Sequence, residues 1–195
     1  APEGVDFVTA LLNAGAELAE LMGEVAATKK GGDGGDLTSV LVNADLEDDY
    51  LDEADLASFF VLLVVAGNET TRNAISWGLR YLTDNPAERA IWASDFEGVA
   101  ATAVEEIVRL ASPVTYMRRT LTRDTVLGGQ EISAGEKVAM FYLAANRDPA
   151  VFDDPYRFDV QRAPNPQYGY GGPGPHFCLG AHLARREITV MFREL

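Results

Sequence analysis

A long helical pattern runs through the chain ahead of its midpoint. Acidic residues suit its beginning at Asp52 or Glu53, and it ends near Thr83, just before Pro86. Its centre is apolar on nearly every side, which is typical of a helix buried through the middle of a larger fold. The longest apolar run, 56–67, is shorter than the roughly 20 residues that a membrane span needs. We therefore expect a core helix and no membrane span.

Small and polar residues interrupt the apolar centre of this helix. Ala66, Gly67, Asn68, Glu69 and Thr70 stand where a core helix would otherwise carry Leu or Val. Thr70 follows Gly67 by three residues and Ala66 by four, so the three lie on one helix face and form a polar notch. Two interpretations are open. In a structural notch, Gly67 admits a neighbouring element and Thr70 bonds to a carbonyl of the preceding turn; a functional notch receives a ligand.

The only cysteine, Cys178, lies between a glycine-rich loop and a predicted helix over about 180–195. Four glycines allow that loop to approach a neighbour closely and to adopt unusual backbone angles: Gly169, Gly171, Gly172 and Gly174. The first N–H groups of the helix favour a thiolate, which suits a soft metal ligand. Two alternatives are an inert buried thiol and a zinc ion bound by His176, Cys178 and His182.

Length and charge narrow the class of protein. A chain of 195 residues that is 47% hydrophobic can form one sizeable domain or a large part of a bigger one. The net charge of −14 argues against binding to nucleic acids or anionic membranes. One cysteine excludes an intramolecular disulfide and suits a reducing cytoplasm. The first ten residues show no signal-peptide pattern, so the expected localisation is cytoplasmic.

The remaining periodicity predicts a mainly α fold with a small β region. Further helices are expected at 5–28, 36–44, 86–95 and 98–110, and short strands at 115–120, 125–127, 131–132 and 137–141. Asp36 is expected to cap the second helix, 29–35 to be a connection and 45–52 a solvated turn. The chain is thus divided into a helical part (1–111), short strands (114–141), a proline-rich meander (145–167) and the cysteine loop with its helix (168–195).

The cysteine loop resembles the proximal haem-binding loop of the cytochrome P-450 superfamily. Residues 174–180, GPHFCLG, meet that family's pattern of glycine, any residue, His or Arg, any residue, the ligand cysteine, any residue, glycine. The resemblance implies haem b, iron protoporphyrin IX, with Cys178 as the axial iron ligand. It also implies that His176 donates to a haem propionate and that Phe177 and Gly180 lie beside the cofactor.

One position departs from the family pattern. Gly171 stands where the family usually has an aromatic residue, and the nearest aromatic, Tyr170, comes one place earlier. The order aromatic–Gly–Gly that begins at Tyr170 resembles actinobacterial members that act on sterols and branched lipids. A steroid or lipid substrate is therefore expected.

The notch carries a second resemblance. Residues 66–71, AGNETT, are similar to the oxygen-binding segment of the family's long central helix. On this resemblance Glu69 and Thr70 are the catalytic acid–alcohol pair that delivers protons to bound oxygen, whereas Ala66 and Gly67 leave room for the oxygen and the cofactor.

Three arginines complete the resemblance. Glu106 and Arg109 resemble the family's glutamate–arginine helix, which implies Arg157 as a third member that helps to lock the helix to the loop leading to Cys178. Without the resemblance, Glu106 and Arg109 would be an ordinary surface pair. Arg119 occupies the place of the family's propionate-binding arginine; otherwise it is a solvated strand residue.

Four motifs in the family's order indicate a cytochrome P-450-like fold, of which this chain resembles a C-terminal portion. The resemblance implies a haem-dependent monooxygenase that hydroxylates an apolar small molecule with dioxygen. Electrons are expected from NAD(P)H through ferredoxin reductase and ferredoxin. Arg185 and Arg186 are either contacts for an acidic ferredoxin or solvated helix charges.

Because only a portion of the family's fold is matched, we expect this segment alone to bind haem weakly and to have little coupled activity. The alternatives are a non-catalytic haem-binding fragment, a peroxygenase, and a metal-free or zinc-bound structural protein.

Overall fold

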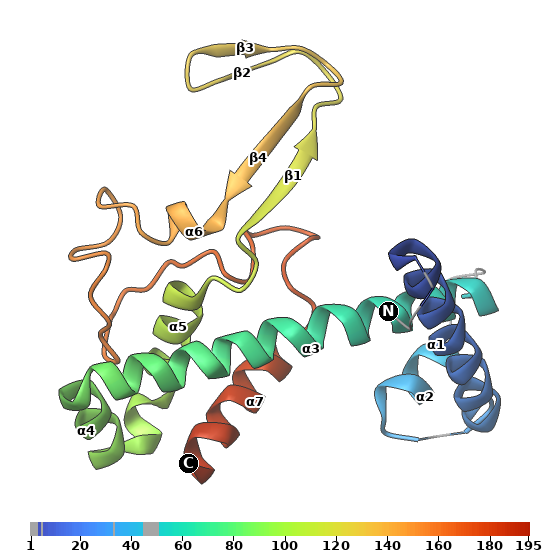
Figure 1. The fold of residues 1–195 in the computed structure, drawn as a ribbon, viewed down its shortest axis with the longest axis horizontal. Coiled ribbons are helices and arrows are strands. Elements are labelled where there is room, and N and C mark those ends of the chain that lie inside the picture. The colour runs from blue at the N-terminus through green and yellow to red at the C-terminus, as the bar shows by residue number, and fades with distance from the viewer. Residues whose placement is uncertain (1–3, 5, 33, 45–50) are drawn as a thin grey trace. The chain divides into compact units, whose positions relative to one another are not determined.

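The computed structural model describes residues 4, 6–32, 34–44 and 51–195. Its elements, labelled in Figure 1, are in chain order α1 (Phe7–Lys29), α2 (Leu37–Val42), α3 (Glu53–Asp84), α4 (Pro86–Ser94), α5 (Phe96–Ala111), β1 (Tyr116–Thr120), β2 (Thr125–Leu127), β3 (Gln130–Ile132), β4 (Lys137–Phe141), α6 (Tyr142–Ala145) and α7 (Ala181–Glu194). The predicted mainly α fold with a small β region is confirmed. The acidic turn expected at 45–52 lies mostly outside the described residues.

The chain divides into two compact units, Ala1–Asn68 and Glu69–Leu195, and the boundary falls inside α3. In the first unit, the Asp36 carboxylate caps α2 as predicted, because it accepts the N–H of Ser39 at 3.0 Å. Lys29 Nζ lies 2.8 Å from Asp36 Oδ2 and closes the connection between α1 and α2. The hydrogen bond from Lys29, with those from Ser39, holds the pKa of Asp36 below its ordinary value of 3.8.

Much of the apolar surface of the first unit is exposed. On α1 the side chain of Met22 is buried, but Leu11 and Leu12 are not. On α3 Leu62 and Val65 are exposed, so the burial expected on nearly every side of the centre of this helix is not found at these two positions. Among the helices that the structure describes, α3 alone has the length and hydropathy of a membrane span, a test that the core helix of a soluble protein also passes.

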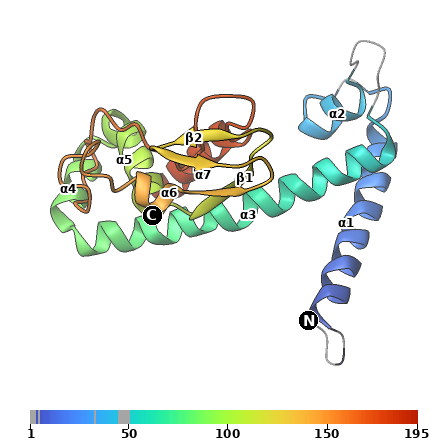
Figure 2. The ribbon, with the colours of Figure 1, turned by 90° about the horizontal axis from the view of Figure 1, so that it is seen from above.

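The second unit is organised around α5, which carries its most deeply buried residues. Ile107 is fully buried in a cluster that also contains Ile188 and Phe192 of α7, and α7 lies beside α5 and the second half of α3 (Figures 1 and 2). A Cβ added at Gly78 of α3 would lie 2.8 Å from Phe192 Cζ and 2.9 Å from Ile107 Cδ1. The close approach of α3 therefore requires a residue without a side chain at position 78.

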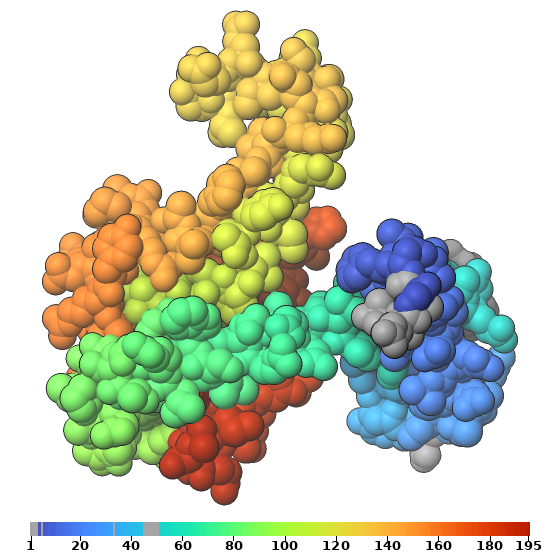
Figure 3. Space-filling view, in the orientation of Figure 1, coloured from blue at the N-terminus to red at the C-terminus, as the bar shows by residue number. Residues whose placement is uncertain are grey.

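The β region forms two antiparallel ladders, which confirms the predicted strands. β1 pairs with β4, so that Tyr116 faces Phe141, and β2 pairs with β3. Gly128 and Gly129 connect β2 to β3 with φ values of 58° and 81°, as a two-residue hairpin turn with positive φ at both positions requires. The ladders project from the helices of this unit as a separate arm (Figures 1 and 3).

Two features of the connection between β4 and α7 bear on the sequence analysis. The short helix α6 was not predicted, because four residues are too few to show a helical period. From Asn146 to Gly180 the chain then has neither helix nor strand, as expected for the meander and the loop. Residues in such a segment are positioned by side-chain contacts rather than by a backbone ladder.

Candidate functional site

Cys178 is a free and exposed cysteine held by its own backbone. Its N–H donates to the carbonyl of Tyr170 at 2.9 Å, and its carbonyl accepts the N–H of Ala181, the first residue of α7, at 3.2 Å. The predicted position of the cysteine, between a glycine-rich loop and a helix, is confirmed. An inert buried thiol is excluded, because Cys178 is exposed.

Three of the loop glycines have the conformational roles that were predicted for them. A Cβ added at Gly169 would lie 2.5 Å from Val108 Cγ1, so the loop can approach α5 only with glycine at this position. Gly171 and Gly174 have φ values of 85° and 136°, which L-residues with side chains rarely adopt. The loop path therefore depends on glycine at these positions.

Tyr170, the displaced aromatic residue of the sequence pattern, is buried beside the cysteine loop. Its ring centre lies 6.4 Å from that of Phe177 and 4.3 Å from the guanidinium carbon of Arg185. Its hydroxyl has no hydrogen-bond partner among the described residues. Burial, together with the negative charge of Glu105, raises the pKa of Tyr170 above its ordinary value of 10.0.

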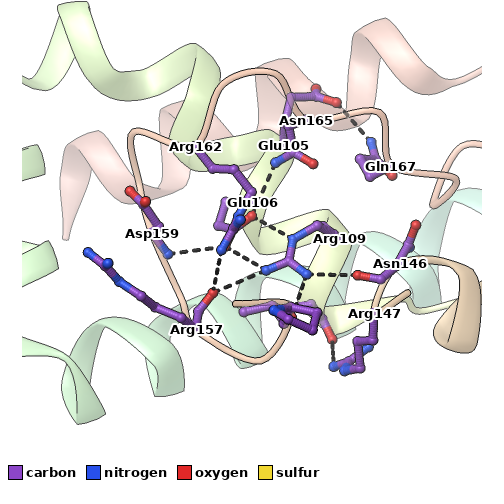
Figure 4. A network of polar contacts seen from close by, with 12 residues as sticks. Glu105, Glu106, Arg109, Asn146, Arg147, Arg157, Asp159, Arg162, Asn165 and Gln167 are labelled. Atoms are coloured by element: carbon purple, nitrogen blue, oxygen red, sulfur yellow. Dashed lines mark hydrogen bonds and ion pairs between the residues drawn. The ribbon is translucent and has the colours of Figure 1, made fainter. Parts of the chain in front are cut away.

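Glu106 and Arg109 form a fully buried ion pair rather than an ordinary surface pair (Figure 4). Arg109 Nε and Nη2 donate to the two Glu106 oxygens at 2.7 and 2.8 Å. Its remaining N–H groups donate to the carbonyls of Asn146 and Pro155, both at 2.7 Å, and of Arg157 at 3.1 Å. A planar guanidinium thus joins α5 to three points of the irregular segment.

The prediction that the Arg157 side chain is the second arginine on Glu106 is wrong. Arg157 is 60% exposed and its Nη2 lies 3.7 Å from Glu88. Arg162 takes the expected place: its side chain is only 10% exposed, and its Nε lies 3.1 Å from Glu106 Oε1. The backbone presents the carbonyl of Arg157 inward, where both Arg109 and Arg162 donate to it, so the Arg157 side chain points elsewhere.

The network reaches the cysteine loop through Asn146, as the lock predicted for the glutamate–arginine helix requires. The Asn146 carbonyl accepts from Arg109, its amide group donates to Ser112 Oγ at 2.9 Å, and its side-chain oxygen accepts the N–H of Tyr168 at 2.7 Å. Tyr168 begins the loop that leads to Cys178. Sequence reasoning missed Asn146, because no local pattern marks it.

The residues predicted for oxygen activation lie on α3, which is unbroken from Ala66 to Thr70. The Glu69 carboxylate forms an ion pair with Arg72, and both side chains are exposed. A Cβ added at Gly67 would meet no atom within 4 Å, so the surface there is open. The roles of Ala66, Gly67, Glu69 and Thr70 stay predictions.

The two residues predicted to hold propionates are exposed on different elements. Arg119 lies on β1 and donates to the carbonyl of Arg118 at 3.1 Å, and His176 lies on the cysteine loop. Both present donors at the surface, where a carboxylate can reach them. Their roles also stay predictions.

The donor set suits haem better than zinc. In the part of the chain that the structure describes, no group of three His, Cys, Asp or Glu side chains could hold a metal ion, so zinc bound by His176, Cys178 and His182 is not supported. Haem iron needs a single cysteine thiolate from the protein on this side. Phe177 and Leu179 are 42% and 71% exposed beside Cys178, so apolar surface flanks the thiol where a macrocycle would pack.

The two arginines that follow the cysteine, Arg185 and Arg186, have different surroundings in the structure. Arg185 Nε donates to Glu105 Oε1 at 2.6 Å, and this hydrogen bond raises the pKa of Arg185 above its ordinary value. Arg186 is exposed. Arg185 is therefore not a solvated helix charge, although Arg186 has the exposure expected of one.

Comparisons with known proteins agree with this architecture. The family model described as Cytochrome P-450 matches residues 99–195. A methyl-branched lipid omega-hydroxylase of Mycobacterium tuberculosis is 60% identical over 160 residues, which are 82% of this chain and 37% of that protein. A steroid C26-monooxygenase of the same organism is 41% identical over 183 residues, 92% of this chain and 42% of that protein.

Solved structures show the same likeness. A Mycobacterium marinum cytochrome P-450 in complex with pseudoionone superposes with a TM-score of 0.92 at 49% identity, covering 98% of this chain and 46% of that one. A Bacillus megaterium cytochrome P-450 in complex with testosterone gives a TM-score of 0.88 at 36% identity, covering 94% and 50%.

The chain shares its fold with these cytochromes P-450, and in it a buried glutamate–arginine network lies behind an exposed cysteine loop. The chain belongs to the cytochrome P-450 family. It spans less than half the length of the two curated relatives described above.

Proposed function

We propose that this chain is part of a haem-dependent monooxygenase that hydroxylates an apolar small molecule, a methyl-branched lipid or a steroid. The observation that carries the proposal is the free, exposed Cys178, held by its backbone between the Tyr170 carbonyl and α7 and flanked by apolar side chains. The names of the relatives, a methyl-branched lipid omega-hydroxylase and a steroid C26-monooxygenase, support the substrate class.

When bound, haem b supplies dioxygen activation and the oxidation of a C–H bond. Cys178 would hold the iron as a thiolate, and Phe177 and Gly180 would lie beside the ring. His176 and Arg119 would donate to the propionates, since both are exposed and carry N–H groups that a carboxylate can reach. The network around Glu106 and Arg109 keeps the loop in place and takes no part in the chemistry.

On α3 we assign proton delivery to Glu69 and Thr70, and space for dioxygen to Ala66 and Gly67. The open surface at Gly67 supports this assignment. The ion pair between Glu69 and Arg72 joins exposed side chains three residues apart, so breaking it costs only a few tenths of a kcal/mol. Glu69 is therefore free to reorient toward a proton donor.

The proposed electron route runs from NAD(P)H through ferredoxin reductase to ferredoxin in the cytoplasm. Haem binding by the 195-residue segment alone is weak in this proposal, because apolar residues of α3 such as Leu62 and Val65 are exposed to water.

The test is the spectrum of the reduced carbon monoxide complex of the full-length protein that contains this chain. Cys178→Ser removes the thiolate-type Soret band, while the control Arg186→Gln, which changes an exposed residue of α7, keeps it. An unchanged band in the Cys178→Ser protein would show that the iron ligand is elsewhere. Spectral shifts on adding methyl-branched fatty acids or steroids then identify the substrate class.

A further inference from the structure

A second polar cluster, distinct from the Glu106–Arg109 network, lies behind the cysteine loop. Arg185 of α7 donates to both oxygens of Glu105 of α5, through Nε at 2.6 Å and Nη2 at 3.3 Å. The two residues are 80 positions apart, and their side chains are only 34% and 24% exposed. A partly buried bidentate contact of this kind fixes both the position and the plane of the guanidinium.

The guanidinium that Glu105 fixes lies over the ring of Tyr170. The distance from the Arg185 guanidinium carbon to the ring centre is 4.3 Å, well inside the range of a cation–π contact. Tyr170 has no hydrogen bond through its hydroxyl among the described residues, so this contact and ring packing hold its side chain.

Glu105 holds the backbone before Tyr170 as well. Gln167 Nε2 donates to Glu105 Oε2 at 2.8 Å, and Gln167 Oε1 accepts the N–H of Gly169. One carboxylate therefore anchors the loop twice, through Gln167 to the backbone and through Arg185 to the ring of Tyr170.

Tyr170 passes this anchoring to the cysteine, because its carbonyl accepts the N–H of Cys178 at 2.9 Å. Gly171 and Gly174, between the two residues, adopt backbone angles that only glycine reaches easily, and the intervening chain has neither helix nor strand to hold it. We propose that Glu105 and Arg185 are positioning residues that hold Cys178 through Tyr170. The consequence for iron ligation rests on the proposed function.

The first test measures the cysteine amide directly and needs no haem. Amide hydrogen exchange is followed by NMR in the 195-residue chain for Glu105→Gln and Arg185→Met, with Arg186→Gln as the matched control on α7. We expect exchange at Cys178 to quicken about tenfold in both variants, the factor that 1.4 kcal/mol represents, and not to change in the control. Arg185→Lys keeps the charge but loses the planar fork, so we expect the amide exchange rate of Cys178 to lie between those of the unsubstituted chain and Arg185→Met.

A second amide separates positioning from general stability. The N–H of Val160 donates to Glu88 at 3.1 Å in the same unit but outside this cluster. We expect its exchange to stay within about twofold of the unsubstituted chain. Equal acceleration at Val160 and Cys178, or no acceleration at Cys178, would overturn the proposal. If Arg185→Met does not fold, Arg185→Lys and Glu105→Gln decide the matter by the same comparison.

The third measurement uses the haem-loaded, full-length protein containing this chain. In the reduced carbon monoxide complex, Glu105→Gln and Arg185→Met lose about half or more of the thiolate-type band, whereas Arg186→Gln retains it. A full thiolate-type band in both variants would overturn the positioning role. If the unsubstituted protein itself lacks the band, the proposed function is wrong. The amide exchange rates still test the positioning of Cys178 in that case, because they are measured without haem.

Discussion

Replacing Arg109 by leucine removes the centre of the buried network in Figure 4. The side chain has no exposed surface and makes two hydrogen bonds to Glu106 and three to backbone carbonyls. Leucine fills part of the volume but donates nothing. Among the described residues, Glu106 then keeps the donors from Arg162, Asn165 and the N–H of Asp159.

The magnitude follows from these contacts. Removing one partner of a buried ion pair costs about 3–5 kcal/mol, and the three carbonyls add to this wherever water cannot reach them. We expect the free energy of unfolding of the second unit to fall by about 4 kcal/mol, a large part of the roughly 5–15 kcal/mol that stabilises a typical domain. Arg80→Leu is the matched control, because Arg80 and Asp84 form an exposed pair on α3 worth at most about 1 kcal/mol.

Urea unfolding followed by tryptophan fluorescence measures the effect. Both tryptophans, Trp77 and Trp92, lie in the second unit, so their signal reports that unit. Arg109→Leu is expected to lower the midpoint by more than about 1 M urea, and Arg80→Leu by less than about 0.5 M. Equal small shifts in the two variants would refute the reasoning that burial makes the Arg109 contacts valuable.

Two further predictions use the same assay. Arg162→Met lowers the free energy of unfolding by about 1.5–3 kcal/mol, because Glu106 loses a donor, whereas Arg157→Met changes it by less than about 1 kcal/mol; the reverse order would restore Arg157 to the network. Tyr170→Phe removes a buried hydroxyl without a partner, so stability stays the same or rises by about 1 kcal/mol. Folding raises the pKa of Tyr170 above its ordinary value of 10.0. The contribution of the protonated hydroxyl to the free energy of unfolding is therefore complete below pH 10.0, and it is lost as the pH rises through the pKa of the folded state. Unfolding curves at about pH 8 and pH 11 should therefore show a smaller alkaline loss in Tyr170→Phe than in the unsubstituted chain, and identical losses would contradict this assignment.

The local elements were predictable because each is specified by neighbours in the sequence. The 3.6-residue period and the cap at Asp36 predicted α2, α3 and α7, and alternation interrupted by glycine turns predicted the four short strands. The helix α6 was not predicted, because a single helical turn is too short to show a 3.6-residue period. The burial expected at the centre of α3 is absent where Leu62 and Val65 lie, since apolar composition states a preference for burial but supplies no covering surface.

The candidate site likewise contains features that the sequence predicted and features that depend on tertiary packing. The sequence identified Cys178 and its glycine loop, and the resemblance to the cytochrome P-450 family singled out the pair of Glu106 with Arg109, three residues apart. Only the tertiary structure decided that Arg162 rather than Arg157 completes the network and that Arg185 braces Tyr170 rather than facing solvent. Arg162 and Glu106 are 56 positions apart, and Arg185 is 80 positions from the Glu105 carboxylate that fixes it, so no backbone period determines which way these side chains point. Packing decides that direction, and packing exists only once the chain has folded.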